Sequence, residues 1–304
     1  MLVRAILSLP GYWWRLRGHL RKRGGIVHVT SHRSVILAAP AAKLARLPVF
    51  WLISQIEDDR GVSVLCDLLA TRTIACSAAA DAALPSLGRR RRAPHTIVPF
   101  PVDPRFANLP DVQPRRPPIV VTTGRLEPSK GQLLLLEAFA IVLTRVPNAR
   151  LRIIGGDQEG HEAYADEVRR IATTLGPAGT VELTGWADRP EELMRDATVY
   201  VCSSRIEGLG IAIIEAMACG LPAVITANTG MADFVEDGQS ALIVANDDPP
   251  AMAEGIVRLL TDPTLAARIA AAGREVTRQF ALDHVVKATA AVLDDMLADA
   301  SAAR

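Results

Sequence analysis

The sequence predicts an α/β protein of two domains, each built on a doubly wound parallel sheet. Short runs rich in Val and Ile alternate with helix-length segments through most of the chain. Continuous apolar strands separated by helices are typical of parallel sheets that are covered on both faces. The length of 304 residues also favours two domains, at roughly 150 residues each.

The boundary between the two domains is expected near residue 110. Residues 103–118 hold five prolines and show no hydrophobic periodicity, which is typical of a linker. We therefore assign residues 1–110 to a first domain with its linker and residues 111–304 to a second domain.

Strands and helices are expected in regular alternation, and more clearly in the second domain than in the first. The first domain has strand patterns at residues 25–30, 48–54, 72–77 and 95–103, with short helices between them. In the second domain, strands are expected at 119–124, 150–156, 181–185, 199–204, 223–226 and 241–244, and helices at about 130–146, 161–175, 190–196, 210–219 and 230–236. From residue 249 the chain is predicted to be helical, with breaks near Pro263 and Phe280.

Composition and charge exclude several classes of protein. A formal net charge of +1 argues against a dedicated nucleic-acid binder, so no nucleic-acid partner is expected. No apolar run reaches the 18 or so residues that a membrane span needs, and Pro10 interrupts an N-terminus that lacks a signal-peptide cleavage pattern. The scattered cysteines indicate buried free thiols in a reducing cytosol: Cys66, Cys76, Cys202 and Cys219.

Basic residues are concentrated near the N-terminus. Residues 1–56 carry nine Lys or Arg side chains and no acidic one. One interpretation is a solvated helix face. The other is contact with an anionic membrane surface, where each basic residue contributes about 1 kcal/mol and aromatic side chains such as Tyr12, Trp13 and Trp14 favour the interface. The second interpretation places the protein in the cytoplasm, peripherally on the inner face of the cell membrane.

The segment "TTGRLEPSKG" joins a strand to a helix and carries two cations. Arg125 and Lys130 follow the strand that ends at Gly124, so both emerge at a carboxyl end of the sheet. Two fixed cations in such a crevice suit a diphosphate. The planar guanidinium of the arginine can donate two parallel hydrogen bonds, and the ammonium group of the lysine acts as a point charge. The alternative is that Arg125 caps the sheet and Lys130 faces solvent.

The segment "SSRIEGLGIAIIEAMACGLP" supplies two carboxylates around the start of a helix. Gly208, Leu209 and Gly210 follow Glu207 and let backbone N–H groups approach an anion at the positive helix N-terminus. Glu215 lies two turns into the helix, where the ribose diol of a nucleotide would lie if phosphates occupied that terminus. A carboxylate suits a diol because it accepts from two neighbouring hydroxyls. The alternative for Glu215 is a buried ion pair with a cation such as Arg125.

Residues 117–285 resemble the donor-binding half of the family 4 retaining glycosyltransferases, which have the GT-B fold of two Rossmann-like domains. The family's G-R-L-x-x-x-K-G stretch is similar to Gly124–Gly131, and its pair of glutamates eight positions apart is similar to Glu207 and Glu215. The A-x-G-x-P that follows is residues 218–222. A glycine-rich turn near residue 230 completes the resemblance, which implies that Thr229 and Gly230 face the nucleotide sugar.

The first domain resembles the acceptor-binding half of the same family, in a shortened form. Its segment "GGIVHVTSHRS" is similar to the family's D-x-x-H-x-H strand; Thr30 stands at the position of the second histidine, and His28 and His32 flank it. The segment that precedes this strand in the family has no counterpart here, so the acceptor half is expected to be shortened or altered. A misplaced coding start, or a partner that supplies strands, is a further interpretation. An incomplete sheet leaves an open edge, which is compatible with a homo-oligomer or with membrane docking.

The resemblance implies transfer of a sugar from a UDP- or GDP-linked donor to a lipid-linked or saccharide acceptor, with retention of configuration, in the synthesis of envelope glycolipid or polysaccharide. Arg125, Lys130 and Glu207 would act in catalysis, without a metal or other cofactor. The acidic cluster at residues 57–61 is the alternative metal site. Other interpretations are a non-catalytic nucleotide-sugar-binding or interaction module with a degenerate acceptor domain, and a related epimerase or phosphorylase.

Overall fold

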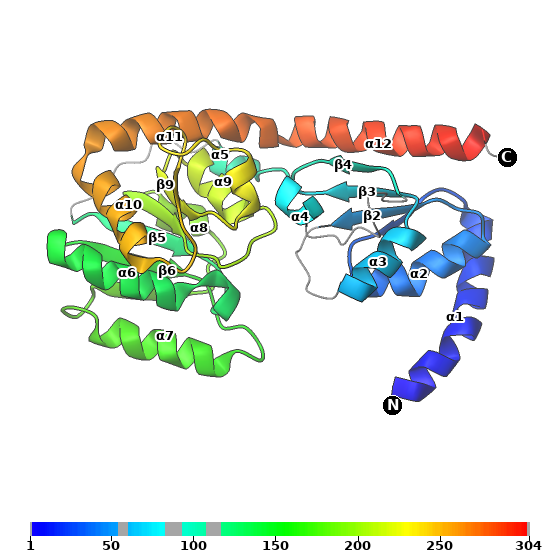
Figure 1. The fold of residues 1–304 in the computed structure, drawn as a ribbon, viewed down its shortest axis with the longest axis horizontal. Coiled ribbons are helices and arrows are strands. Elements are labelled where there is room, and N and C mark those ends of the chain that lie inside the picture. The colour runs from blue at the N-terminus through cyan, green and yellow to red at the C-terminus, as the bar shows by residue number, and fades with distance from the viewer. Residues whose placement is uncertain (1, 54–59, 83–92, 108–116, 303–304) are drawn as a thin grey trace. The chain divides into compact units, whose positions relative to one another are not determined.

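A computed structural model describes residues 2–53, 60–82, 93–107 and 117–302 (Figure 1). It divides into two compact units. The first comprises Met1–Pro99 with Asp283–Arg304, and the second comprises Phe100–Leu282. Each unit contains a parallel sheet with helices packed on it, as the sequence predicts.

In the described part of the first unit, four parallel strands lie side by side in chain order. Val27 pairs with Val49, and Ile74 pairs with Thr96 further across the sheet. All four predicted strand positions are confirmed: β1 (Val27–Val29), β2 (Val49–Ile53), β3 (Arg72–Ala75) and β4 (His95–Ile97). The helices of this unit that precede residue 99 are α1 (Leu2–Arg23), α2 (His32–Leu44), α3 (Arg60–Leu69) and α4 (Ala78–Ala82).

The last helix, α12 (Leu282–Ala302), packs on the first unit, although the sequence analysis assigned it to the second domain. Its Val285, Val292 and Met296 form a buried cluster with Phe50, Ile74 and Val98. Burial of this apolar face accounts for the correction, because each fully buried aliphatic side chain contributes about 1.5–3 kcal/mol. The boundary expected at residue 110 is also wrong, since the second unit begins at Phe100 and includes residues 100–107. Val102 N–H donates there to Phe280 O at 2.8 Å, which ties this stretch to the second unit.

The described part of the second unit contains a six-stranded parallel sheet in the order β10-β9-β8-β5-β6-β7. β8 and β9 are buried along their whole length, which explains their continuous apolar sequence. The observed strands confirm the predicted ones to within two residues: β5 (Ile119–Thr123), β6 (Arg150–Ile154), β7 (Val181–Gly185), β8 (Val199–Cys202), β9 (Ala223–Thr226) and β10 (Leu242–Val244).

Helices cover both faces of this sheet (Figure 1). α6 packs against α7 and α10, whereas α9 packs against α11. Asp248 and Asp262 cap α10 and α11 by accepting backbone N–H bonds of 2.9 Å, and both helices have Pro in the first turn. The helices of this unit are α5 (Pro104–Ala107), α6 (Gln132–Arg145), α7 (Glu162–Thr174), α8 (Pro190–Met194), α9 (Ile211–Ala218), α10 (Pro249–Thr261) and α11 (Pro263–Thr277).

One predicted helix of the second unit differs from the observed structure. Residues 230–236 were expected to be helical, but only a 3-10 turn forms there, η2 (Gly230–Asp233). Phe234 then packs on Phe280, with ring centroids 5.1 Å apart, and Gly238 N–H donates to Ala241 O in a tight turn. The ring contact of Phe234 and the turn at residues 238–241 leave too few residues between them for a regular α-helix.

The topology of the second sheet creates a crevice at β5. The chain proceeds from β5 outward through β6 and β7, and later returns to place β8 on the other side of β5. The loops that follow β5 and β8 therefore diverge at the carboxyl edge of the sheet. In doubly wound folds this switch point is where ligands bind.

Candidate functional site

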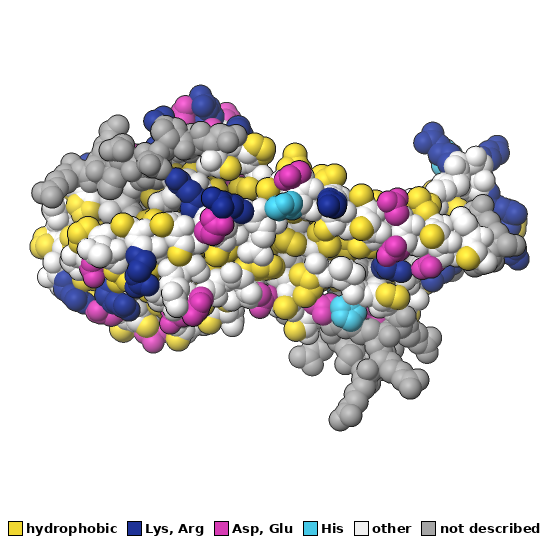
Figure 2. Space-filling model, turned by 90° about the horizontal axis from the view of Figure 1, so that it is seen from above, with side chains coloured by type: hydrophobic (Ala, Val, Ile, Leu, Met, Phe, Trp, Pro, Cys, Tyr) yellow, Lys and Arg dark blue, Asp and Glu magenta, His cyan; other side chains and the backbone are white. Residues whose placement is uncertain are grey.

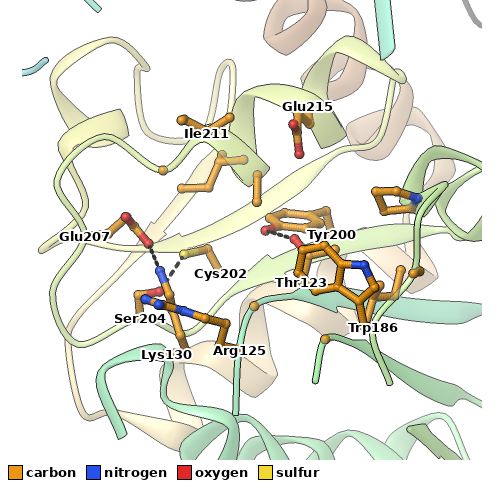
Figure 3. Close-up of a pocket in the computed structure, with 18 residues that line it drawn as sticks. Thr123, Arg125, Lys130, Trp186, Tyr200, Cys202, Ser204, Glu207, Ile211 and Glu215 are labelled. Carbon is orange, nitrogen blue, oxygen red and sulfur yellow. Dashed lines mark hydrogen bonds and ion pairs between the residues drawn. The ribbon is translucent and has the colours of Figure 1, made fainter. Parts of the chain in front are cut away.

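A pocket of about 550 Å³ opens at the carboxyl ends of β5, β6, β7 and β8, beside the start of α9 (Figure 3). Six of the residues predicted from the sequence line it. They come from two segments far apart in the chain: Gly124, Arg125 and Lys130 follow β5, and Glu207, Gly210 and Glu215 lie just before and within α9. The structure therefore brings the two predicted motifs together at the switch point.

Lys130 and Glu207 form an ion pair across the pocket, from Nζ to Oε2 (Figure 3). Each side chain is about one-fifth exposed. Two bonds hold the loops that carry them: Ser203 Oγ donates to Lys130 O at 2.9 Å, and Arg205 N–H donates to Ser129 O at 2.8 Å. A cation and a carboxylate are thus held at neighbouring positions, where one can bind a phosphate and the other can accept hydrogen bonds from hydroxyls.

Gly131 permits this approach of the two loops. Its φ is +67°, and a Cβ added there would lie 2.0 Å from Ser203 O. Gly131→Ala should therefore lower the free energy of unfolding by about 2–4 kcal/mol, through backbone strain and the clash. Gly238→Ala is the control, because φ there is +72° but a Cβ would meet nothing within 4 Å. Urea denaturation of both variants measures the difference; an equal loss in the two would show that the loop contact does not matter.

Arg125 is held at the rim with half of its side-chain surface exposed. Its guanidinium donates to Gln158 Oε1 at 3.1 Å and to Glu127 Oε1 at 3.2 Å. The alternative from the sequence, in which Arg125 pairs with Glu215, is wrong, since Arg125 makes these bonds instead. Its backbone is fixed because the buried Gln132 donates to Arg125 O at 2.8 Å. An exposed guanidinium on a fixed backbone is suited to binding an anion at this edge.

Glu215 lies on α9, half-buried, and contributes to the pocket wall. The pKa of this carboxyl is raised to about 7, mainly by burial and also by the nearby Asp103 carboxylate, while Arg105 opposes the change. Glu191, 2% exposed on α8, is a further negative neighbour that raises it. Glu215 is thus poised to change its charge near neutral pH.

The affinity for a ligand diol should depend on pH through Glu215. A diol donates to the ionised carboxylate, so lowering the pH through 7 protonates Glu215 and weakens binding. With a pKa near 7, about one molecule in ten is ionised at pH 6, which gives about a tenfold weaker affinity than at pH 8. Titrations of a nucleoside diphosphate at both pH values measure this. A phosphate also titrates near pH 6, so the control is Glu215→Gln; an unchanged pH dependence in that variant would contradict the assignment.

Of the remaining predicted donor-side residues, Gly230 holds the backbone of Glu207. Gly230 N–H donates to Glu207 O at 2.9 Å, and Glu207 N–H donates to Asn228 O at 3.1 Å. Thr229 and Leu209 are buried, at 1% and 2% exposure. Among the described residues, Gly208, Leu209, Thr229 and Gly230 do not line the pocket. Direct contact of these four residues with a ligand stays a prediction.

Sequence reasoning missed several residues of the wall. Tyr200 and Cys202 lie on β8, and Tyr200 Oη is 3.1 Å from Thr123 Oγ1 on β5. Because side chains alternate along a strand, Tyr200 and Cys202 point to the same side, and this spacing in "VYVC" was the available signal. Trp186 follows β7 and lies on the far side of the pocket from Glu207 (Figure 3). Nothing in the order of the sequence places Trp186 near Glu207.

The acceptor-side residues predicted from the sequence do not come together. His28 packs on Phe50 with ring centroids 5.0 Å apart, and burial lowers its pKa. His32 Nε2 lies 3.1 Å from Ser63 Oγ, and its ring is 5.6 Å from that of Trp51. Phe50 and Trp51 are consecutive on β2 and so point to opposite faces of the sheet, as do the two histidines packed on them.

Thr30, between the two histidines, is exposed, and its backbone N–H donates to Ser34 Oγ at 3.1 Å. His28 also lines a separate pocket of about 500 Å³ beside α12. The roles of these three residues in acceptor binding stay predictions.

No group of three His, Cys, Asp or Glu residues able to hold a metal ion occurs among the described residues. Residues 57–59 of the acidic cluster lie outside the described residues. All four cysteines are buried thiols. Within the described ranges, none of the helices combines the length and the apolar character needed to span a bilayer.

Curated relatives match somewhat more than half of the chain. A GDP-mannose-dependent α-(1-6)-phosphatidylinositol monomannoside mannosyltransferase of Mycolicibacterium smegmatis is 34% identical over 197 residues, which cover 59% of this chain and 49% of that protein. The lipopolysaccharide core biosynthesis glycosyltransferase LpsE of Rhizobium meliloti is 33% identical over 176 residues, with coverage of 58% and 49%. The chain spans about half the length of these relatives.

Solved structures match nearly the whole chain. HepE of Anabaena in complex with UDP superimposes with a TM-score of 0.82 at 20% identity, over 93% of this chain and 82% of that chain. Sucrose-phosphate synthase from Thermosynechococcus elongatus gives a TM-score of 0.78 at 22% identity, over 96% and 79%. At these identities the likeness establishes the fold, which is GT-B.

The family model described as glycosyl transferases group 1 matches residues 109–276, more than half of the chain. The matched range contains every residue that forms the pocket described above. The chain therefore belongs to the group 1 glycosyltransferases.

Proposed function

We propose that the protein transfers a sugar from a nucleoside diphosphate donor, UDP- or GDP-linked, to an acceptor, with retention of configuration and without a metal. The observation that carries this proposal is the convergence of Arg125, Lys130, Glu207 and Glu215 on one pocket at the switch point of the second sheet. A structural neighbour binds UDP-glucose, and relatives are named as glycosyltransferases. Retention rests on the resemblance to the retaining family.

The geometry supports a division of labour along the donor. The diphosphate would lie against Lys130 and the start of α9, where a cation and the helix N-terminus both favour negative charge. Charge that develops on the leaving diphosphate would be stabilised by these fixed groups. Arg125, at the rim of the pocket, would donate paired hydrogen bonds to the phosphate oxygens. Glu207, paired with Lys130, would hold the sugar hydroxyls.

Turnover of the donor tests the proposal. The protein is incubated with UDP-glucose, UDP-N-acetylglucosamine or GDP-mannose and a lipid or oligosaccharide extract, and the released nucleoside diphosphate is measured. Release from one donor, dependent on the extract, is the expected result, and NMR of the product should show the anomeric configuration of the donor. Donor binding without release from any donor would contradict transfer and favour the non-catalytic module.

The acceptor is proposed to be lipid-linked or a saccharide, at the cytoplasmic face of the cell membrane. Relatives are named for phosphatidylinositol mannoside and for lipopolysaccharide core. On α1, Trp14 is 66% exposed and carries the Arg17 guanidinium 4.7 Å from its ring centroid. The last turn of α1 adds Arg21, Lys22 and Arg23. Lys and Arg side chains gather at one end of the first unit (Figure 2), a composition suited to an anionic bilayer.

Vesicle binding measures this contact. The protein should co-sediment with phosphatidylcholine vesicles that contain phosphatidylglycerol and not with phosphatidylcholine alone. Reversing Arg15, Arg21 and Lys22 to Glu should weaken binding by at least about fivefold per residue, since each contributes about 1 kcal/mol. Arg278→Glu, an exposed arginine of the second unit, is the control. Equal binding to vesicles with and without phosphatidylglycerol would contradict the proposal.

A further inference from the structure

The last helix, α12, carries a second apolar stripe beside the one that it buries. Val285, Val292 and Met296 are buried against the first unit. Four more apolar side chains follow one another at spacings of four, three and four residues, which places them together on the adjoining face of the helix: Val286, Ala290, Leu293 and Leu297. Val286 is 55% exposed and Leu297 is 45% exposed. Contacts within the unit therefore use only part of the apolar surface of α12.

This stripe forms one wall of the pocket of about 500 Å³ beside α12. Ala290, Leu293 and Leu297 line the pocket from the helix, and Ile26 and Phe50 line it from the side of the sheet. β1 stands at the end of the strand order, so no further strand of the described sheet lies beyond it. A contiguous apolar surface of this kind indicates an interaction site, which a single exposed leucine would not.

Two charged side chains flank the stripe on the side away from the buried face. Lys287 and Asp294 are seven residues apart, so they lie in one column along the helix. Both are exposed, and within the described residues neither forms an ion pair. When two copies of such a helix pack antiparallel about a two-fold axis, these flanking positions face each other across the seam. Lys287 of each copy then meets Asp294 of the other, so two ion pairs form.

The charge of α12 favours a protein partner over a bilayer. The helix carries four aspartates and a single lysine. An anionic membrane surface, which suits the basic end of α1, would repel this helix. An acyl chain or an uncharged peptide would leave Lys287 and Asp294 without partners, whereas a second copy of the chain supplies a partner for both.

We propose that the stripe is the contact surface for a second copy of this chain, with the two α12 helices packed antiparallel about a two-fold axis. Val286 of one copy lies opposite Leu297 of the other, and Ala290 lies opposite Leu293. Each contact occurs twice, because a two-fold axis presents the same surface from both copies. The donor pocket is formed by residues of the second unit alone, so loss of this contact should leave donor turnover unchanged.

The mass of the whole chain in solution tests the inference. Size-exclusion chromatography with light scattering should give twice the mass of the chain at about 100 μM, well above a dissociation constant in the micromolar range. Leu297→Glu places a charge in the apolar seam from both copies and should weaken association at least about 100-fold. Ala288→Glu is the control, because it adds the same charge at an exposed position of α12 away from the stripe.

Charge reversals test the antiparallel pairing itself. Lys287→Glu and Asp294→Lys, made singly, each place two pairs of like charges across the seam and should weaken association about tenfold. The double variant exchanges the two charges, so opposite charges face each other again and association should return to that of the unmodified protein. Circular dichroism of each variant verifies that the chain remains folded.

Three results would overturn the inference. The first is a monomer at every concentration, which leaves the stripe to a different occupant. The second is a dimer whose dissociation constant changes in none of these variants, which places the contact on another surface. The third is a double variant that associates as weakly as the single ones, which shows that Lys287 and Asp294 do not face each other.

Discussion

Replacing Lys130 by alanine is expected to lower the rate of donor turnover about 100- to 1000-fold, the loss that accompanies removal of one preorganised donor to a developing anion. Lys130 Nζ points into the pocket at the switch point, beside Glu207 and the start of α9 (Figure 3). Since its position is fixed by the Ser203 bond to its own carbonyl, no reorganisation is needed when negative charge develops. The release of nucleoside diphosphate measures the effect.

Two further variants make this prediction specific. Lys287→Ala removes an exposed lysine on α12 and should leave the rate unchanged. Lys130→Arg keeps the positive charge but replaces the compact ammonium group with a planar guanidinium, so partial activity is expected. If Lys130→Ala turned over the donor at the normal rate, Lys130 would not stabilise the leaving diphosphate, and this part of the mechanism would be wrong.

Glu207→Ala and Glu215→Ala are expected to differ in their effects on the free nucleoside diphosphate. Glu207 lies against Lys130, whereas Glu215 projects from α9 on another side of the pocket (Figure 3). Glu207→Ala should therefore weaken the nucleotide sugar and spare the free nucleoside diphosphate. Glu215→Ala should weaken both ligands, because both contain the ribose. Hydrogen bonds to a charged group contribute about 1.5–3 kcal/mol, which corresponds to about 10- to 150-fold in affinity.

Calorimetry on the two variants with both ligands checks this division. Glu254→Ala serves as the control, because this exposed glutamate on α10 pairs with Arg145 and does not line the pocket. Equal losses for both ligands in both glutamate variants would mean that the two carboxylates do not read separate parts of the donor.

The sequence was most informative where local pattern and burial agree. The predicted strands at residues 181–185 and 223–226 coincide with β7 and β9, because each is a short run of strand-favouring residues bounded by turn residues. Arg125, Lys130, Glu207 and Glu215 could be placed in one pocket because parallel strands direct their following loops to the same edge. The ion pair between Lys130 and Glu207 could not be predicted, since it depends on how closely the loops after β5 and β8 approach.

Features that depend on packing between distant segments could not be predicted from the sequence. α12 is an amphipathic helix whose apolar face could cover either unit, and only the contacts of Val285, Val292 and Met296 with Phe50 assign it to the first. Trp186 lies one residue beyond β7 and gives no local signal of function. Its place in the pocket follows from strand order, in which β7 lies two strands from β5.

The most direct test of the donor site is calorimetric titration of the protein with UDP and with GDP, repeated on Lys130→Ala. The account predicts binding of one nucleotide class at a single site and its loss in the variant, in which the cation that faces the diphosphate is gone. Failure to bind either nucleotide at about millimolar concentration, on the order of 4 kcal/mol of binding free energy, or undiminished binding by Lys130→Ala, would contradict it.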